Sequence, residues 1–163
     1  MARLVDQATT RLVWCTSIAS ISAPTTTELN AGTDLTANMV TSYDVGADAS
    51  DKISEQAVAD TAKTEAPTLQ NYHGTLVLFR QYTAGAPSGG DALATFAGNY
   101  EAGYFVRRTG KSSTSAWATS DKVEVYQFVA DVPQLQGGTA SGYVKATVPM
   151  LAQGNFKVAA TVA

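Results

Sequence analysis

Apolar and polar residues alternate over several short stretches of this chain, which is the pattern of half-buried β-strands. Leu12 and Trp14 alternate with Val13 and Cys15, so a strand with two different faces is predicted over residues 11–19. The chain therefore favours a mainly β fold, an antiparallel β-sandwich or barrel of about seven or eight strands with one or two short flanking helices. Further strands are predicted over residues 35–44, 74–82, 103–110, 121–132, 143–150 and 155–162.

One stretch near the N-terminus carries the signals of a short helix instead. Thr25 is followed three residues later by Glu28, which is the spacing of a capping box. Gly32 is placed to take the left-handed conformation that ends many helices, so a helix is predicted over residues 25–31. A second short helix is expected over the stretch ALATFA, which Asp91 can cap.

The 163 residues favour a single domain, residues 1–163. Residues 1–10 are interpreted as an N-terminal arm. Residues 45–72 are acidic, rich in small side chains and poorly periodic, and they are interpreted as a long inter-strand loop. Loops of this length without regular structure are either functional or disordered. A segment of this kind suits contacts that become ordered on assembly.

Charge and composition narrow the classes of partner. Charged residues make up 15% of the chain, against about a quarter in an average domain. The net charge is −3, and the only Lys/Arg cluster is VRRTGK at residues 106–111, which argues against a nucleic-acid-binding surface. No stretch approaches the roughly 18 consecutive apolar residues of a membrane span. The apolar runs at the N-terminus are too short for a signal peptide, so export through Sec is not expected.

Candidate chemistry is sparse along the chain. The stretch GAPSGGD at residues 85–91 has the glycine spacing of a phosphate-binding loop, but Asp91 stands where the lysine is needed. We interpret it as a flexible loop. His73 is the only histidine and Cys15 the only cysteine, so one chain cannot supply a conventional zinc site. No cofactor and no enzymatic activity are predicted.

The remaining charged groups have simpler interpretations. Arg107 and Arg108 are adjacent in a predicted strand, so they lie on opposite faces, and ion pairs are expected in preference to anion binding. The acidic residues of the central segment have irregular spacing, which favours a solvated loop over a calcium site. These carboxylates are Asp44, Asp48, Asp51, Glu55, Asp60 and Glu65.

Three motifs in this order resemble the major tail tube proteins of long-tailed (siphovirus-type) phages, in the form common among phages of actinobacteria. They are ISAPTTTELNAGTDLT at residues 21–36, VRR at 106–108 and DKVEVY at 121–126. The chain departs from the family pattern at Gln127, where a proline is familiar, and residues 45–72 have no match. The residues that match in the first motif are Pro24, Thr25, Glu28, Leu29, Ala31, Gly32, Asp34 and Leu35.

The resemblance implies a structural role. Such proteins form hexameric rings that stack into a hollow tube, and the genome leaves the virion through it without being bound specifically. The resemblance also implies a fold shared with the tube protein of type VI secretion, and assembly in the host cytoplasm. The partners that it implies are further copies of the chain and the tape-measure, tail terminator and baseplate or tail-tip proteins.

The arm, the long loop and the subunit edges are the expected contact regions between copies. Two alternatives remain open: a β-sandwich module that binds glycans or a cell surface, and the tube protein of a secretion or tailocin-like machine. The residues expected to take part in self-assembly are Leu4, Val5, Asp34, Asp44, Ile53, Val58, Leu69 and Tyr72.

Overall fold

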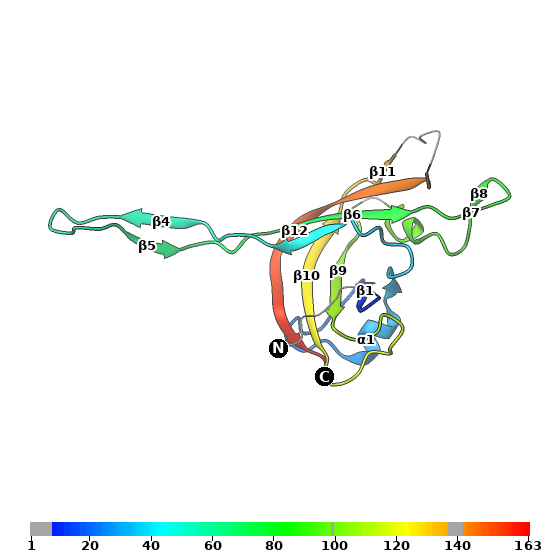
Figure 1. The fold of residues 1–163 in the computed structure, drawn as a ribbon, viewed down its shortest axis with the longest axis horizontal. Helices are drawn as coiled ribbons and strands as arrows, with labels where there is room; N and C mark the ends of the chain where they lie inside the picture. Colours follow the sequence, from blue (N-terminus) through cyan, green and yellow to red (C-terminus); the bar gives the residue numbers. More distant parts are fainter. Residues whose placement is uncertain (1–7, 99, 137–141) are drawn as a thin grey trace.

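The computed structural model describes residues 8–98, 100–136 and 142–163, and one antiparallel sheet of eight strands dominates it. Its strands are β1 (Thr10–Cys15), β2 (Thr33–Asp34), β3 (Asp44–Ala47), β6 (Tyr72–Phe79), β9 (Ala102–Thr109), β10 (Lys122–Ala130), β11 (Gln134–Leu135) and β12 (Lys145–Thr161). Their order in space is β2–β1–β9–β10–β12–β6–β3, and β11 also pairs with β12 (Figure 1). The predicted mainly β, antiparallel fold is confirmed.

The two faces of the central strands are covered by different elements. Leu12 and Trp14 of β1 belong to a cluster that also contains residues of β6 and of a 3₁₀-helix, η1 (Ala92–Phe96). Val13 and Cys15 point to the other face and belong to a second cluster, which packs near the α-helix α1 (Thr26–Ala31). Because both faces are buried, the strand is apolar at consecutive positions, as the sequence indicated for residues 12–15.

The sheet curls strongly enough for its end strand β3 to contact β9. Strand β3 does not neighbour β9 in the sheet, yet Arg107 of β9 donates from Nη1 to the carbonyl oxygen of Val45 in β3 over 3.2 Å. The ring centroid of Tyr72, on β6, lies 5.2 Å from the ring centroid of Phe128 on β10. Strands β3 and β6 therefore fold over the inner face of β9 and β10 and close the first cluster into a sandwich-like core.

The capping box that the sequence predicted for α1 is confirmed. The backbone N–H of Glu28 donates to the Thr25 hydroxyl over 3.2 Å, and the Glu28 carboxylate accepts from the backbone N–H of Thr25 over 2.7 Å. The predicted left-handed conformation of Gly32 is wrong, since its φ is −73°. Glycine is needed there for space, because a Cβ would lie 2.6 Å from Val13 Cγ2 and 2.7 Å from the carbonyl oxygen of Trp14.

A strand over residues 35–44 was expected, and the structure corrects this. Strand β2 ends at Asp34, whose carboxylate accepts from the backbone N–H of Thr36 over 2.9 Å and turns the chain. The N–H groups of Asn38 and Met39 then bond to the carbonyl of Leu35, as in a helical turn. Leu35 and Met39 are buried, so the apolar alternation reports a loop that packs on the core rather than a strand.

The last two predicted strands are one continuous strand in the structure. Gly154, expected to form a turn, lies inside the 17 residues of β12 with a φ of +83°. The register with β10 changes around it, from Tyr126 opposite Phe156 to Phe128 opposite Ala152. Glycine allows this irregularity because an L side chain rarely adopts a positive φ. The signal for a turn thus marks a bulge in a long strand.

Candidate self-assembly surfaces

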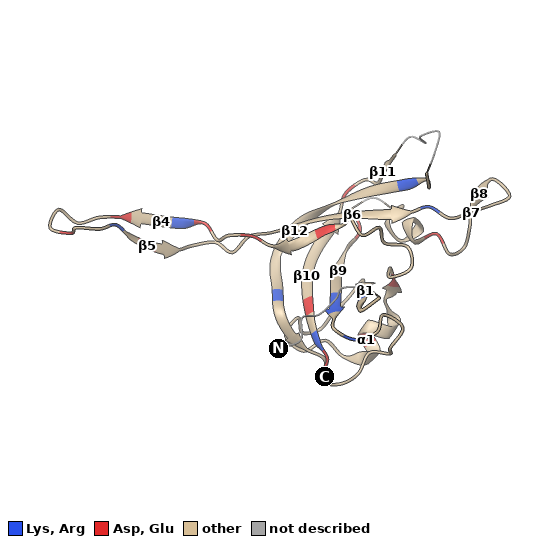
Figure 2. Cartoon of the chain, in the orientation of Figure 1, with Lys and Arg blue, Asp and Glu red and all other residues tan. Residues whose placement is uncertain are grey.

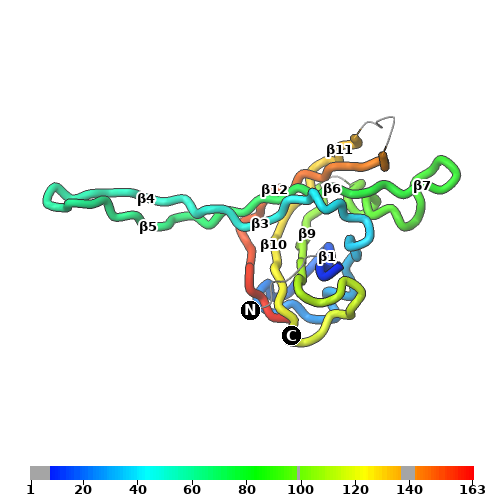
Figure 3. Tube along the Cα trace, in the orientation of Figure 1, coloured from blue at the N-terminus to red at the C-terminus, as the bar shows by residue number. Residues whose placement is uncertain are grey.

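A β-hairpin projects far from the body of the molecule. It consists of β4 (Lys52–Glu55) and β5 (Thr64–Pro67), which pair antiparallel (Figures 1 and 3). Every residue of both strands is exposed. The interpretation of residues 45–72 as a connection without regular structure is therefore wrong. Backbone pairing holds the hairpin together, and such pairing leaves no apolar period in the sequence.

Hydrogen bonds continue from the hairpin into the sheet. The backbone N–H of Asp48 donates to the carbonyl of Asn71 over 2.8 Å, and that of Asp51 donates to Leu69 over the same distance. At this root His73 lies between two carboxylates, with Nδ1 2.7 Å from Asp48 and Nε2 3.0 Å from Asp44. Hydrogen bonds to Asp44 and Asp48 raise the pKa of His73. The interactions join β3 and β6 where the hairpin leaves the sheet.

Strand β12 has an unpaired edge. Residues 145–150 pair with β6 on one side, whereas β10 pairs with residues 150–161 on the other. Beyond Met150, no strand in the described part of the chain covers the side that β6 occupied, and Figure 1 shows β12 at the border of the molecule. An uncovered strand edge offers backbone N–H and C=O groups to another chain.

Exposed apolar side chains accompany this edge and the opposite end of the molecule. Leu151 and Val158 on β12 have exposed fractions of 45% and 49%. A separate groove of about 450 Å³ lies between η1, β8 (Ala86–Pro87) and β11. Its lining is mainly apolar and includes the exposed Leu135. Surface of this kind is typical of protein contact sites.

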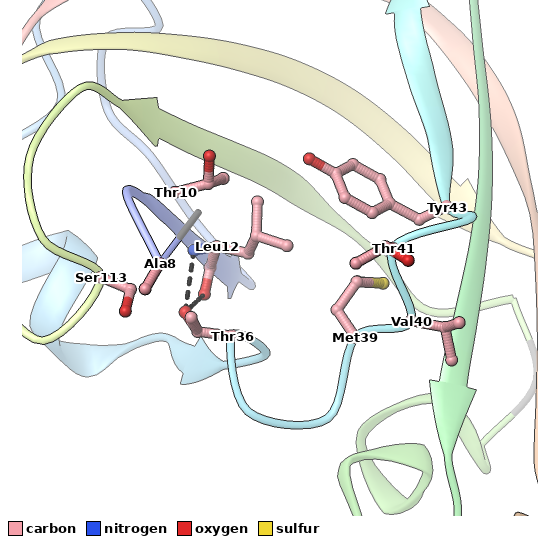
Figure 4. Close-up of a pocket in the computed structure, with 9 residues that line it drawn as sticks. All are labelled: Ala8, Thr10, Leu12, Thr36, Met39, Val40, Thr41, Tyr43 and Ser113. Carbon is pink, nitrogen blue, oxygen red and sulfur yellow. Dashed lines mark hydrogen bonds between the residues drawn. The ribbon is translucent and has the colours of Figure 1, made fainter. Parts of the chain in front are cut away.

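A second cleft, of about 260 Å³, lies beside the start of β1 (Figure 4). The Thr36 hydroxyl at its edge accepts from the N–H of Leu12 over 3.0 Å and donates to the carbonyl of the same residue over 3.2 Å. The remaining lining residues carry hydroxyl or apolar side chains, and none of these nine residues is a carboxylate, a histidine or a lysine. The cleft therefore offers no acid–base pair for catalysis.

Charged residues are scattered and mostly paired. Figure 2 shows Lys and Arg interspersed with Asp and Glu over the sheet and the hairpin. The pairing expected for both arginines is confirmed, because Arg107 pairs with Glu124 and Arg108 with Asp121. The described residues contain no group of His, Cys, Asp and Glu side chains able to hold a metal ion. Within the described helices, none is long and apolar enough to cross a membrane.

The comparison with protein families decides what kind of molecule this is. A family described as phage tail tube protein matches residues 1–163. The chain belongs to the phage tail tube protein family. The comparison with curated proteins found no match. The protein is thus a structural component of the virion tail, and the resemblance to tail tube proteins is confirmed at the level of the family.

Two of the predicted self-assembly residues of this tail tube protein, Ile53 and Val58, lie on the hairpin, and Leu69 follows the end of β5. Ile53, Val58 and Leu69 are exposed, with fractions of 54%, 108% and 65%. Leu4 and Val5 of the expected N-terminal arm 1–10 lie outside the described residues. Thr10, the last residue of the expected arm, is the first residue of β1.

The other three predicted residues have partners within the chain. Asp34 forms an ion pair with Arg11, and Asp44 contacts His73. Tyr72 is buried within the chain. Its hydroxyl donates to the carbonyl of Gln127 and accepts from the N–H of Gln153, each over 2.6 Å, so Tyr72 fixes the irregular part of β12.

The open edge of β12 and the groove beside η1 were not found from the sequence. The strand predicted over residues 155–162 would place four alternating apolar residues, Phe156, Val158, Ala160 and Val162, on one face. A register shift between Lys157 and Ala160 interrupts that alternation, so Phe156 packs on the first cluster while Ala160 packs on the second. Only the pairing of β6 shows where the edge becomes free, and pairing between distant strands has no local sequence signal.

Proposed function

We propose that this tail tube protein assembles into hexameric rings, which stack into the hollow tube through which phage DNA leaves the virion. The observation that carries the proposal is the open edge of β12. A strand at that edge would pair with a strand of the next subunit, so that the sheets of neighbouring subunits join around the ring. The hairpin β4–β5 adds a second contact region, which reaches beyond the body of one subunit.

The charge distribution fits a conduit. A protein that binds DNA through its phosphates needs clustered lysine and arginine, and such binding would resist passage of the genome. Here the net charge is −3, and the arginines of β9 are neutralised by Glu124 and Asp121. DNA accordingly passes without specific binding, and the role is structural rather than catalytic.

The tube needs partners at its two ends and in its lumen. We assign these places to a terminator, to baseplate or tail-tip proteins and to a tape-measure protein, in a long-tailed phage that assembles in the host cytoplasm. A secretion or tailocin-like tube would use the same subunit contacts. Isolation of the tube together with a DNA-filled capsid, rather than free, separates a phage tail from those machines.

Negative-stain electron microscopy across a concentration series, beside sedimentation velocity, tests the proposal. We expect rings and hollow tubes with six subunits in each ring. Val158→Lys places a charge beside the open edge of β12 and should abolish the tubes while the monomer stays folded. Thr119→Lys, an exposed site on a loop, is the matched control and should leave them intact. A wild-type protein that remains a compact monomer, even with tail-tip proteins added as nucleus, would overturn the proposal.

A further inference from the structure

The tip of the hairpin presents one apolar side chain on a rigid turn. Val58 has an exposed fraction of 108%, which is the largest value among the exposed large hydrophobic side chains in the described part of the chain. Three hydrogen bonds close the turn around it: Gln56 Nε2 to the carbonyl of Asp60 (2.8 Å), the N–H of Asp60 to the carbonyl of Ala57 (3.0 Å), and the N–H of Ala57 to the Asp60 carboxylate (3.1 Å). The turn is therefore preorganised for insertion.

The tip carries only one charged group that docking would have to desolvate. Residues 56–62 have the sequence QAVADTA, in which Asp60 is the only charged residue. Its carboxylate accepts a hydrogen bond from the N–H of Ala57, which offsets part of the cost of removing this charge from water. The neighbours of Val58 are Ala57 and Ala59, whose small side chains leave the valine as a single projecting knob.

The opposite end of the molecule carries a groove that is mainly apolar, like the side chain of Val58. The groove of about 450 Å³ is lined by apolar side chains from η1, β8 and the segment around β11, and its volume lies within the roughly 300–1,000 Å³ of typical binding pockets. At its edge Arg80 and Asp91 form an almost completely buried ion pair of 2.8 Å, so neither charge lacks a partner. The apolar residues of the groove are Pro87, Leu93, Ala94, Ala97, Val132 and Leu135, with Pro133 between the last two.

The knob and the groove cannot meet within one chain. The hairpin extends from one side of the body, whereas β7 (Tyr82–Thr83), β8 and β11 lie at the other side (Figures 1 and 3). A contact between two different surfaces of identical chains is heterologous, and it repeats from copy to copy until it closes a ring or extends a filament. A second copy of this chain is therefore the occupant that the geometry favours.

We propose that the tip of β4–β5 from one copy inserts Val58 into the groove between η1, β8 and β11 of a second copy. The proposal rests on the proposed tube function and specifies one of its contacts. Because each copy offers one knob and one groove, this head-to-tail contact links every subunit to two others.

Cysteine crosslinking between two separately purified variants tests this contact. Val58→Cys and Ala94→Cys change exposed positions, so both variants should fold. The native Cys15 does not interfere, since it is buried and burial raises its pKa to about 12. The two variants carry tags of different mass, are mixed at a concentration that gives tubes, and are oxidised with copper phenanthroline.

We expect a crosslinked heterodimer from the mixture. A double variant that carries both Val58→Cys and Ala94→Cys should give a ladder of crosslinked oligomers. Ala23→Cys, exposed and remote from the groove, replaces Ala94→Cys as the control and should give at least tenfold less heterodimer. Equal crosslinking at the two positions would overturn the proposal. So would tubes in which Val58→Cys forms no crosslink with Ala94→Cys, a result that leaves the tube function intact and assigns the groove to another tail protein.

A second variant keeps the conclusion independent of oxidation. Ala94→Glu buries a charge if the groove is occupied, and we expect it to raise the concentration needed for assembly at least tenfold, whereas Ala23→Glu should leave that concentration unchanged. Equal behaviour of the two glutamate variants would overturn the docking. If the cysteine variants crosslink but the wild-type protein never forms tubes, the docking is supported and the tube function is overturned instead.

Discussion

The guanidinium of Arg108 donates to the carboxylate of Asp121 over 2.9 Å, and both side chains are almost completely buried. Arg108 also donates to backbone carbonyl oxygens of the loop at residues 112–116, and Lys111 contacts the second carboxylate oxygen. Burial alone would raise the pKa of Asp121, but hydrogen bonds from Lys111 and Arg108 outweigh it and hold that pKa below its usual value. The pair fastens the loop that carries Trp117 over the second cluster.

Replacing Asp121 with asparagine should unfold the protein more easily than any change at the surface. The variant leaves Arg108 buried without its counter-charge, which costs about 3–5 kcal/mol of the free energy of unfolding. Glu124→Gln is the control, because the pair of Glu124 with Arg107 is partly exposed and should cost about 1 kcal/mol or less. Urea unfolding followed by tryptophan fluorescence measures both. Similar losses in the two variants would contradict the role given to the buried pair.

Gly32→Ala should destabilise the monomer although the φ of Gly32 is ordinary. The added Cβ would lie 2.6–2.8 Å from atoms of Val13, Trp14 and Cys15, and the displaced core should cost about 1–3 kcal/mol. Gly89→Ala is the matched control, since a Cβ there meets nothing within 4 Å. Thermal unfolding of the two variants gives the comparison. An unchanged melting temperature for Gly32→Ala would show that β1 and α1 can move apart at no cost.

What the sequence could predict was local. The capping box depends on two side chains three residues apart, and the faces of β1 depend on alternation over a few positions, so both were found. Gly32 was assigned to a helix end because that role is local, whereas its close approach to β1 depends on the fold. The alternation from Leu35 to Met39 was real, but its cause was a loop held by Asp34 and by a hydrogen bond to Leu12.

For the candidate assembly surfaces, the sequence indicated the segment at residues 45–72 but did not indicate that it forms a hairpin. The acidic, small residues from 45 to 72 pointed to a segment outside the core, and Ile53, Val58 and Leu69 do lie exposed on it. Its pairing as a hairpin is carried by the backbone, which leaves no side-chain period to detect. The groove beside η1 brings together residues from 80 to 135, and only long-range pairing places them side by side.

The contact of His73 with two carboxylates gives the hairpin root a pH dependence. Both ring nitrogens lie within hydrogen-bond distance of Asp44 or Asp48, and only the protonated imidazole can donate from both. Because these contacts raise the folded pKa of His73, their stabilisation is complete below its ordinary value of about 6.5 and is lost as the pH rises through the folded pKa.

An NMR titration of the single histidine should therefore give a pKa above 6.5. Asp48→Asn should lower that pKa, whereas Asp60→Asn, at the far tip of the hairpin, should leave it unchanged. A wild-type value at or below 6.5 would mean that the two carboxylates do not hold the ring in solution.

Replacing the hairpin with a tight turn should separate folding from assembly. Residues 50–69 are exchanged for Asn-Gly, which favours a two-residue hairpin loop, while β3 keeps its pairing with His73 and Tyr72. The free energy of unfolding should not fall, because the removed strands bury no core residue and a shorter connection costs less closure entropy. Tubes should disappear in negative stain. Lys52→Gln, which breaks the exposed ion pair with Glu65 but retains the hairpin, should assemble normally. An unfolded turn variant would place the hairpin in the folding core, and normal tubes from it would remove the hairpin from the contacts between subunits.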